Sequence, residues 1–455
     1  ACSLRRQDQN PRSPVAHRSN VESAGATVTT VERTLDVARG VVRSARFTQA
    51  VTLSIIGTAF FTHLLRQVIG WPGLIAIVVA LCVVVVVSLG LDWRERQWGR
   101  LVPVSVICWL GWVGLSLLWS QYQWVTLGGL AYLFAFTILG IYVAIFRDTI
   151  QIVRAFGDVL RLVVALSLAV ELLSGVLLDA PFEFLWVRGS LAEGGPIQGV
   201  MGTRNALGLI AIFALITFAI EWRTRSVTKT TAWLSVAGAA ACVVFARSPI
   251  VAALVVTVAI AAGTLYLLRR APAPRRTQWQ LYILVGVAIV AGVVWAFRTQ
   301  VIAVFNGGGQ LNYRLDLWRE MWTYIARHPL EGWGWTGRWP LGIPPFPAFD
   351  SSDASNSGLN AFLDAWLQVG LVGALILVGV IGLAFVRSWL LAGRRRSSVF
   401  AWSALVLVAL IGASAFESAV LFESAWLIAV VCSVNAGREI SWRRALTAAD
   451  KSHPA

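Results

Sequence analysis

Long apolar runs recur along almost the whole chain, and they limit the folds that it can adopt. Of its 455 residues, 57% are hydrophobic and only 13% are charged. A helix rises about 1.5 Å per residue, so roughly 20 apolar residues cover a hydrocarbon core of about 30 Å. Runs of this length predict transmembrane helices, and the fold class is therefore an all-α, polytopic integral membrane protein.

About twelve such runs are present, each near the length of a membrane span. They cover Phe47–Leu65, Trp71–Leu91, Leu101–Trp119, Val125–Phe146, Val159–Leu178, Ala206–Trp222, Thr230–Ala246, Ile250–Leu268, Trp279–Phe297, Phe362–Val386, Val399–Phe416 and Ala419–Ala436. The run at Thr230 is short, and the last two are separated only by Glu417 and Ser418.

These runs divide the chain into five parts. Residues 1–46 form a basic tail without apolar periodicity, which we expect to be disordered and cytoplasmic. Helices one to nine occupy residues 47–297 and helices ten to twelve occupy residues 362–436, before a second tail at 437–455. The polar stretch at residues 298–361 interrupts the apolar pattern, and we expect it to be the one large extracytoplasmic loop.

The net charge of +15 follows the expected membrane topology. If the first tail is cytoplasmic and twelve spans follow, most of the 38 basic residues lie inside, as the positive-inside rule requires. Both termini are then cytoplasmic, and anionic membrane lipids are the expected partners of the surface charge. Nucleic acid is not an expected partner.

The cysteines offer neither a disulfide framework nor metal-ligand spacing. Cys82, Cys108, Cys242 and Cys432 all fall inside apolar runs, and only Cys2 does not. No metal or other cofactor is predicted.

A few arginines fall on the outer side, where the positive-inside rule predicts few. Arg66 and Arg298 end apolar runs, where long side chains reach headgroups. Arg247 lies in a tight turn, Phe245-Ala246-Arg247-Ser248-Pro249. It is an interfacial anchor, the partner of a distant carboxylate, or an anion site for a lipid-linked phosphate, to which guanidinium binds in bidentate geometry. Arg204, just before another run, is a candidate for the same cavity.

The loop contains a predicted amphipathic helix rich in tryptophan. Leu311, Leu315, Trp318, Trp322 and Ile325 recur at helical spacing, with Asn312 as a possible N-cap and Pro329 as a stop. We expect this helix to lie on the outer membrane surface, with Arg314 within about one turn of Trp318. The indoles of Trp318, Trp322, Trp333, Trp335 and Trp339 suit the membrane interface and also the faces of sugar rings.

Three motifs in order resemble the O-antigen ligase family of bacterial envelope proteins, which also includes Wzy-type polymerases. They are Arg314-x-x-x-Trp318, then the segment His328-Pro329-Leu330-Glu331-Gly332-Trp333-Gly334, then Leu359-Asn360-Ala361-Phe362-Leu363 leading to Gly373. The turn at Arg247 is similar to the Ser-Arg turn of the family. This resemblance implies a membrane glycosyltransferase of GT-C-like architecture in the bacterial inner (plasma) membrane.

The resemblance also implies roles for individual residues. It implies that Arg247 and Arg314, with Arg204 nearby, bind the phosphate of a polyprenyl-linked glycan donor. Trp318, Trp333, Arg338 and Asn360 are then expected to line the substrate cavity. The histidine that the family places before the asparagine is replaced by Leu359, which cannot accept a proton.

Another residue must then supply the general base. The candidates are Asp353, which we favour, and Asp350, His328 and Asp364. Simple solvation of the two loop aspartates is an equally good interpretation of each alone, and His328 could only cap the helix end. Asp364 lies inside an apolar run, where ionisable residues are costly and often functional.

The expected reaction is a single displacement. An acceptor hydroxyl on an envelope lipid or polysaccharide attacks the anomeric carbon, while arginine stabilises the departing polyprenyl phosphate or diphosphate. The alternative is a transporter or flippase of a lipid-linked glycan, because Glu171, Glu417 and Glu423 inside or beside apolar runs also suit transport. That alternative predicts repeated halves, which the sequence does not show, and leaves the tryptophan-rich loop unexplained.

Overall fold

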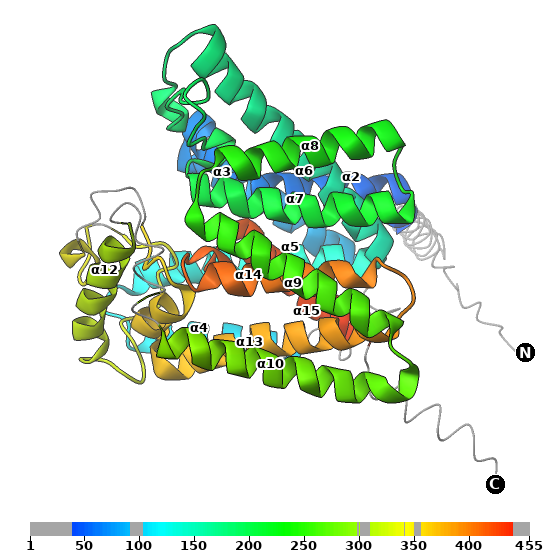
Figure 1. The fold of residues 1–455 in the computed structure, drawn as a ribbon. Helices are drawn as coiled ribbons and strands as arrows, with labels where there is room; N and C mark the ends of the chain where they lie inside the picture. The colour runs from blue at the N-terminus through cyan, green and yellow to red at the C-terminus, as the bar shows by residue number, and fades with distance from the viewer. Residues whose placement is uncertain are drawn as a thin grey trace, which may run out of the picture.

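The computed structural model describes residues 39–91, 103–297, 300, 310–340, 342–349 and 356–439. Within these ranges the chain is helical, and the β-type pairing is an isolated bridge between Phe182 and Val187. Most helices run side by side in one bundle, and α12 lies at one end of it, across the direction of the others (Figure 1). Asp350 and Asp353 lie outside the described residues.

Thirteen helices make up the described part of the bundle and its loop. They are α2 (Ala45–Phe60), α3 (Thr62–Leu91), α4 (Val104–Leu115), α5 (Gln123–Phe146), α6 (Thr149–Leu172), α7 (Arg204–Thr224), α8 (Lys229–Phe245), α9 (Pro249–Arg270), α10 (Arg276–Ala296), α12 (Gln310–Ile325), α13 (Ala361–Arg394), α14 (Phe400–Ser414) and α15 (Glu423–Glu439).

Six helices of the described chain are long and apolar enough to cross a membrane. They are α3, α5, α6 with the π-helical turn that extends it to Leu177, α7, α9 and α13. Helices α4, α8 and α14 are apolar but shorter. The all-helical class is therefore confirmed, while the structure identifies six candidate spans where the apolar runs predict about twelve.

The centre of the bundle is formed by α14 and α15. Helix α15 packs against α5 and α13, and α14 packs against α13, α9 and α7. Trp402 of α14 and Trp426 of α15 are buried, and their indoles donate to Thr217 and Thr137 on neighbouring helices. By contrast, α3 and α9 expose apolar side chains such as Val83 and Ile260, as expected of helices that face lipid.

Helix α13 is broken at Val369 and Gly370, and the loop closes the break. Gly370 has a φ of 71°, so the helical hydrogen-bond ladder stops there. Trp333 N–H donates to the Leu367 carbonyl over 3.0 Å, and Gly334 N–H donates to the Gln368 carbonyl over 2.8 Å. Backbone groups freed by the break are therefore satisfied by the Gly332-Trp333-Gly334 segment, as they must be in a low-dielectric setting.

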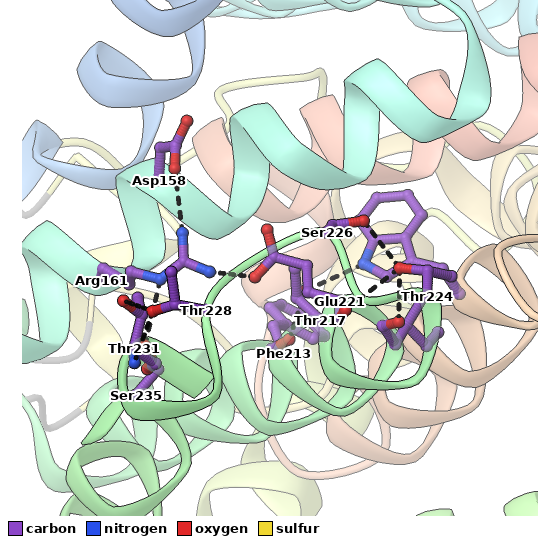
Figure 2. A network of polar contacts seen from close by, with 12 residues as sticks. Asp158, Arg161, Phe213, Thr217, Glu221, Thr224, Ser226, Thr228, Thr231 and Ser235 are labelled. Atoms are coloured by element: carbon purple, nitrogen blue, oxygen red, sulfur yellow. Dashed lines mark hydrogen bonds and ion pairs between the residues drawn. The ribbon is translucent and has the colours of Figure 1, made fainter. Parts of the chain in front are cut away.

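A buried ionic contact joins α6 to α7 (Figure 2). Arg161 lies between Asp158, at 2.9 Å, and the carboxylate of Glu221, and its Nε donates to Ser235 of α8 over 3.1 Å. The contact ties three helices together and fully engages the Arg161 guanidinium.

Some helix boundaries differ from those that the apolar pattern predicts. Helix α6 begins at Thr149 rather than Val159, because Asp148 and Gln151 form a capping box in a polar turn that apolar periodicity does not detect. Helix α12 begins at Gln310, so Asn312 lies inside the helix and is not its N-cap. The predicted first run is divided at Phe61 between α2 and α3.

Candidate functional site

A polar network joins the loop helix α12 to the ends of three bundle segments. Arg314 is only 5% exposed, and its Nη2 lies 2.9 Å from Glu417 Oε1. The same oxygen accepts from Asn205 Nδ2 over 2.7 Å, and Ser248 Oγ donates to Asn205 Oδ1 over 2.8 Å. The network therefore runs from α12 through the α14–α15 connection to the starts of α7 and α9.

This network determines which face of α12 is buried. The pattern predicts an apolar face through Leu311, Leu315, Trp318, Trp322 and Ile325. Of these residues Ile325 is buried, together with Arg314, Leu317 and Met321, whereas Trp322 is 45% exposed. Arg314 faces inward because Glu417 and the Phe416 carbonyl, 3.3 Å from Arg314 Nε, meet it there. Burial raises the pKa of the Glu417 carboxyl, and the charge of Arg314 opposes that rise.

Arg247 and Arg204 lie beside the same network. Arg247 is exposed, has a φ of 45° and directly precedes Ser248. Its guanidinium lies against Gly194, where an added Cβ would be 2.6 Å from Nη2. Arg204 directly precedes Asn205, donates to the Arg247 carbonyl over 3.5 Å and interacts electrostatically with Arg314. The structure thus brings the three predicted phosphate ligands to one end of the bundle, linked through Asn205 and Glu417.

The Arg-x-x-x-Trp spacing also has a structural explanation. Trp318 is one turn after Arg314, and its indole donates to the Gly358 carbonyl over 2.9 Å. Arg314 and Trp318 therefore attach one side of α12 to two segments, the α14–α15 connection and the start of α13. This arrangement requires residues about four apart on a helix.

Asn360 and Asp364 hold the start of α13. Asn360 Oδ1 accepts from the N–H groups of Phe362 and Leu363, and its Nδ2 donates to the Ala415 carbonyl over 3.1 Å. Asp364 is fully buried and accepts from Trp339 Nε1, Gln368 Nε2 and Gly358 N–H over 2.8 to 3.0 Å. Because both Asp364 oxygens are occupied by donors, these contacts suit a positioning role better than proton transfer.

Leu359, at the position of the family histidine, is part of an apolar cluster. It is 7% exposed, has a φ of 49°, and packs in a cluster with Met321, Trp339, Phe346 and Phe349. The replacement of histidine by leucine is therefore matched by an apolar environment.

His328 pairs with a residue of its own motif. His328 Nδ1 lies 2.9 Å from Glu331 Oε1, and its ring packs edge-on against Trp333 with centroids 4.7 Å apart. The hydrogen bond to His328 holds the pKa of Glu331 below its ordinary value. Trp333 Nε1 donates to the Tyr324 carbonyl, which joins this motif to the end of α12.

A second network surrounds Glu423, and the sequence pattern did not indicate it. Its carboxylate accepts from Thr62 Oγ1 at 2.7 Å, Arg66 Nη1 at 2.9 Å, Arg338 Nη2 at 3.1 Å and Tyr132 OH at 3.2 Å. Arg66, interpreted from sequence as a headgroup anchor, is instead part of this ion pair. Arg66 and Glu423 are 357 residues apart, so no local sequence pattern indicates that they pair.

Two cavities meet at this second network. One, of about 340 Å³, is lined by residues that include His63, Arg66, Thr203 and Glu417, and the other, of about 570 Å³, by Tyr132, Trp335 and Trp339. Arg338 and Glu423 line both. Of the four residues predicted to line a substrate cavity, Arg338 lines both of these cavities, whereas Trp318, Trp333 and Asn360 line neither.

Comparison with known families agrees with the motifs. No curated protein matches the chain. The sequence model of the O-antigen ligase family matches residues 231–378, a stretch that runs from α8 to the middle of α13 and includes Arg247, Arg314 and Asn360. That match agrees with the predicted family over this part of the chain, which is similar to the O-antigen ligase family.

Proposed function

We propose that the protein is a membrane glycosyltransferase that moves a glycan from a polyprenyl phosphate or diphosphate donor to a hydroxyl of an envelope lipid or polysaccharide. The observation that carries the proposal is the network through which Glu417 and Asn205 connect Arg314 of the loop with the Arg247-Ser248 turn. The two arginine motifs are far apart in sequence, and a shared anion would explain why both lie at this end of the bundle.

In this mechanism each arginine has a different role in binding the donor phosphate. Arg247 is exposed and makes no side-chain hydrogen bond or ion pair with the described residues, so its guanidinium is available for a donor phosphate. Arg314 has Nε and Nη2 engaged, which fixes its plane and leaves Nη1 for the same ligand. Arg204 adds positive charge beside them. Fixed cations stabilise the negative charge that develops on the leaving oxygen, because they need no reorganisation during the reaction.

The acceptor is proposed to approach from the cavities beside Glu423. Thr203 and Glu417 both line the cavity of about 340 Å³. Thr203 directly precedes Arg204 in sequence, and Glu417 forms the ion pair with Arg314. Arg338, with its ring contact to Phe422 at 5.3 Å, offers a cation and an aromatic face for a sugar. Asp353 remains our first candidate for the general base, followed by Asp350 and His328, and the scheme requires no metal.

The proposed location is the bacterial inner membrane, with twelve spans in a GT-C-like arrangement and both termini in the cytoplasm. Arginines at the ends of α7, α9, α10 and α13 line one cavity. These helix ends lie away from α12 (Figure 1), and the arginines support a cytoplasmic assignment for that end of the bundle. The loop and the Arg314 network are then extracytoplasmic. The O-antigen ligase match favours the enzyme over a transporter or flippase.

The test is glycan transfer from a polyprenyl-linked donor by Arg247→Ala, Arg314→Ala and Asp353→Asn, with membrane insertion measured for each. Loss of a fixed donor to a developing negative charge is expected to lower the rate about 10²- to 10³-fold for each arginine. Arg319→Ala is the matched control, because Arg319 lies on the same helix but is 77% exposed and pairs only with Asp316. Full activity in both Arg247→Ala and Arg314→Ala would refute the proposal, whereas activity in Asp353→Asn would refute only the base assignment.

A further inference from the structure

A cavity of about 780 Å³ lies at one end of the bundle. The helix ends that surround it lie opposite α12 (Figure 1). Its walls are the last turns of α7, α9 and α13 and the first turns of α10 and α14. It is separate from the two cavities beside Glu423, with which it shares no lining residue.

The charged residues that line this cavity are all basic. None of the described residues that line it is acidic, and seven are arginines: Arg223, Arg269, Arg270, Arg276, Arg394, Arg395 and Arg396. Glu221 lies close in sequence to Arg223, but its carboxylate is paired with Arg161 of α6 (Figure 2). Like charges gathered around one space repel each other, so this end of the bundle attracts an anion.

Two of these arginines build the wall. Arg269 Nε donates to the Ala392 carbonyl over 2.8 Å and its Nη2 to the Arg395 carbonyl over 2.9 Å. Arg276 donates to the Ala271 carbonyl over 3.1 Å. These side chains cap carbonyls at the ends of α9 and α13, a favourable position for a cation.

Arg223 and Arg270 both make cation–π contacts with the ring of Tyr266. Their guanidinium carbons lie 5.8 Å and 4.4 Å from the centroid of the Tyr266 ring, and they come from different helices. A cation–π contact orients each planar group without consuming its N–H donors. Arg394 and Arg396, both exposed, add charge on the α13–α14 connection. The arginines therefore approach the cavity from separate elements and present donors suited to phosphate oxygens.

The rim of the cavity is apolar. Two exposed aromatic side chains line it, Trp222 of α7, which is 45% exposed, and Tyr266 of α9, which is 40% exposed. Such side chains on helices α7 and α9 suit contact with acyl chains, and indole favours the membrane interface. A ligand that satisfies both the basic cavity and its apolar rim must itself be amphipathic.

We propose that this cavity binds the phosphate-bearing headgroup of an anionic membrane lipid, with its acyl chains along the exposed sides of α7 and α9. The proposal does not depend on glycan transfer. Soluble phosphate shares the headgroup chemistry, but it would leave the apolar rim without a partner. Basic pockets between transmembrane helices on the cytoplasmic side are a known setting for such headgroups.

The test uses the full-length protein in a neutral detergent and native mass spectrometry to measure bound lipid. The probes are dioleoylphosphatidylglycerol, dioleoylphosphatidylcholine and inorganic pyrophosphate. The variant Arg394→Gln/Arg396→Gln is expected to bind phosphatidylglycerol about 30-fold more weakly, at about 5-fold for each basic residue lost. Arg394→Lys/Arg396→Lys should retain most of the affinity, because the charge remains.

The matched control is Arg319→Gln/Arg327→Gln, which removes the same charge from exposed positions at the other end of the bundle. It should leave phosphatidylglycerol affinity within about 2-fold of wild type. Equal binding by wild type and Arg394→Gln/Arg396→Gln, or equal binding of phosphatidylcholine and phosphatidylglycerol, would overturn the proposal. Pyrophosphate binding as tight as phosphatidylglycerol binding would overturn the lipid assignment and identify a soluble phosphate site.

Discussion

Replacing Glu417 by alanine should destabilise the protein more than the removal of any exposed charged side chain in the loop does. The carboxylate accepts from Arg314 Nη2 at 2.9 Å and from Asn205 Nδ2 at 2.7 Å, and both bonds end on Oε1. Arg314 is 5% exposed, so Glu417→Ala leaves a guanidinium buried without its counter-charge. Asn205 loses a partner in the same step.

The expected cost follows from burial. Removing one partner of a buried ion pair typically costs about 3–5 kcal/mol. The Glu417 side chain retains 23% exposure, which lets water replace part of the interaction, so we expect about 3 kcal/mol, at the lower end of that range. Glu417→Gln keeps an acceptor oxygen but loses the charge, and it should cost about 1–2 kcal/mol.

The assay is the free energy of unfolding in mixed detergent micelles, measured with a denaturing detergent. Asp316→Ala is the control, because it removes the partner of Arg319 from an exposed pair and should cost no more than about 0.5 kcal/mol. A double-mutant cycle with Arg314→Met should give a coupling energy above about 1.5 kcal/mol. Equal unfolding free energies for Glu417→Ala and Asp316→Ala would refute the reasoning that Glu417 holds α12.

Three further substitutions test other parts of the loop. Gly332→Ala should destabilise the protein by at least about 1–2 kcal/mol, because the φ of Gly332 is 73° and an added Cβ would meet the backbone of Gln368 and Gly370. Gly342→Ala is the control and should be neutral in the same unfolding assay, because the space around Gly342 is open. Leu359→His should cost about 1–3 kcal/mol by placing imidazole in an apolar cluster and should not increase glycan transfer; a faster rate would contradict the account. The pKa of Glu331 is lowered in the folded state. Its hydrogen bond to His328 therefore stabilises the fold at pH values above the ordinary Glu pKa, and this stabilisation is lost as the pH falls through the lowered pKa. Unfolding free energies of wild type and His328→Ala should therefore converge as the pH falls through the lowered pKa of Glu331, and a difference that does not change with pH would contradict this.

Helix positions could largely be predicted from sequence because apolar runs report directly on helices in lipid. Each predicted run overlaps an observed helix, and α7 and α9 match within two residues at each end. Errors arose where a polar signal determined the boundary. The capping box at Asp148 starts α6 before its apolar run. The predicted start at Trp71 directly follows the interruption of α3 at Gly70, whereas the division between α2 and α3 at Phe61 falls inside the first predicted run.

The site could be predicted only in part, because its contacts join distant segments. The motifs single out Arg314 and the Arg247 turn, whose phosphate-binding roles remain predictions. Arg314 and Glu417 are 103 residues apart, and no local pattern pairs them. The apolar face predicted for α12 includes Ile325, which is buried, but it does not include the buried residues Arg314, Leu317 and Met321. Likewise, Glu423 forms ion pairs with Arg66 and Arg338, which lie in distant parts of the chain.

The most direct measurement of the central claim is equilibrium binding of a polyprenyl diphosphate to purified wild type, Arg247→Ala, Arg314→Ala and Arg319→Ala. The account predicts that Arg247→Ala and Arg314→Ala each weaken binding about 10-fold or more, as expected for loss of a charge-assisted hydrogen bond, while Arg319→Ala binds like wild type. Equal affinity in all four proteins would contradict the claim that the two arginine motifs hold one phosphate ligand.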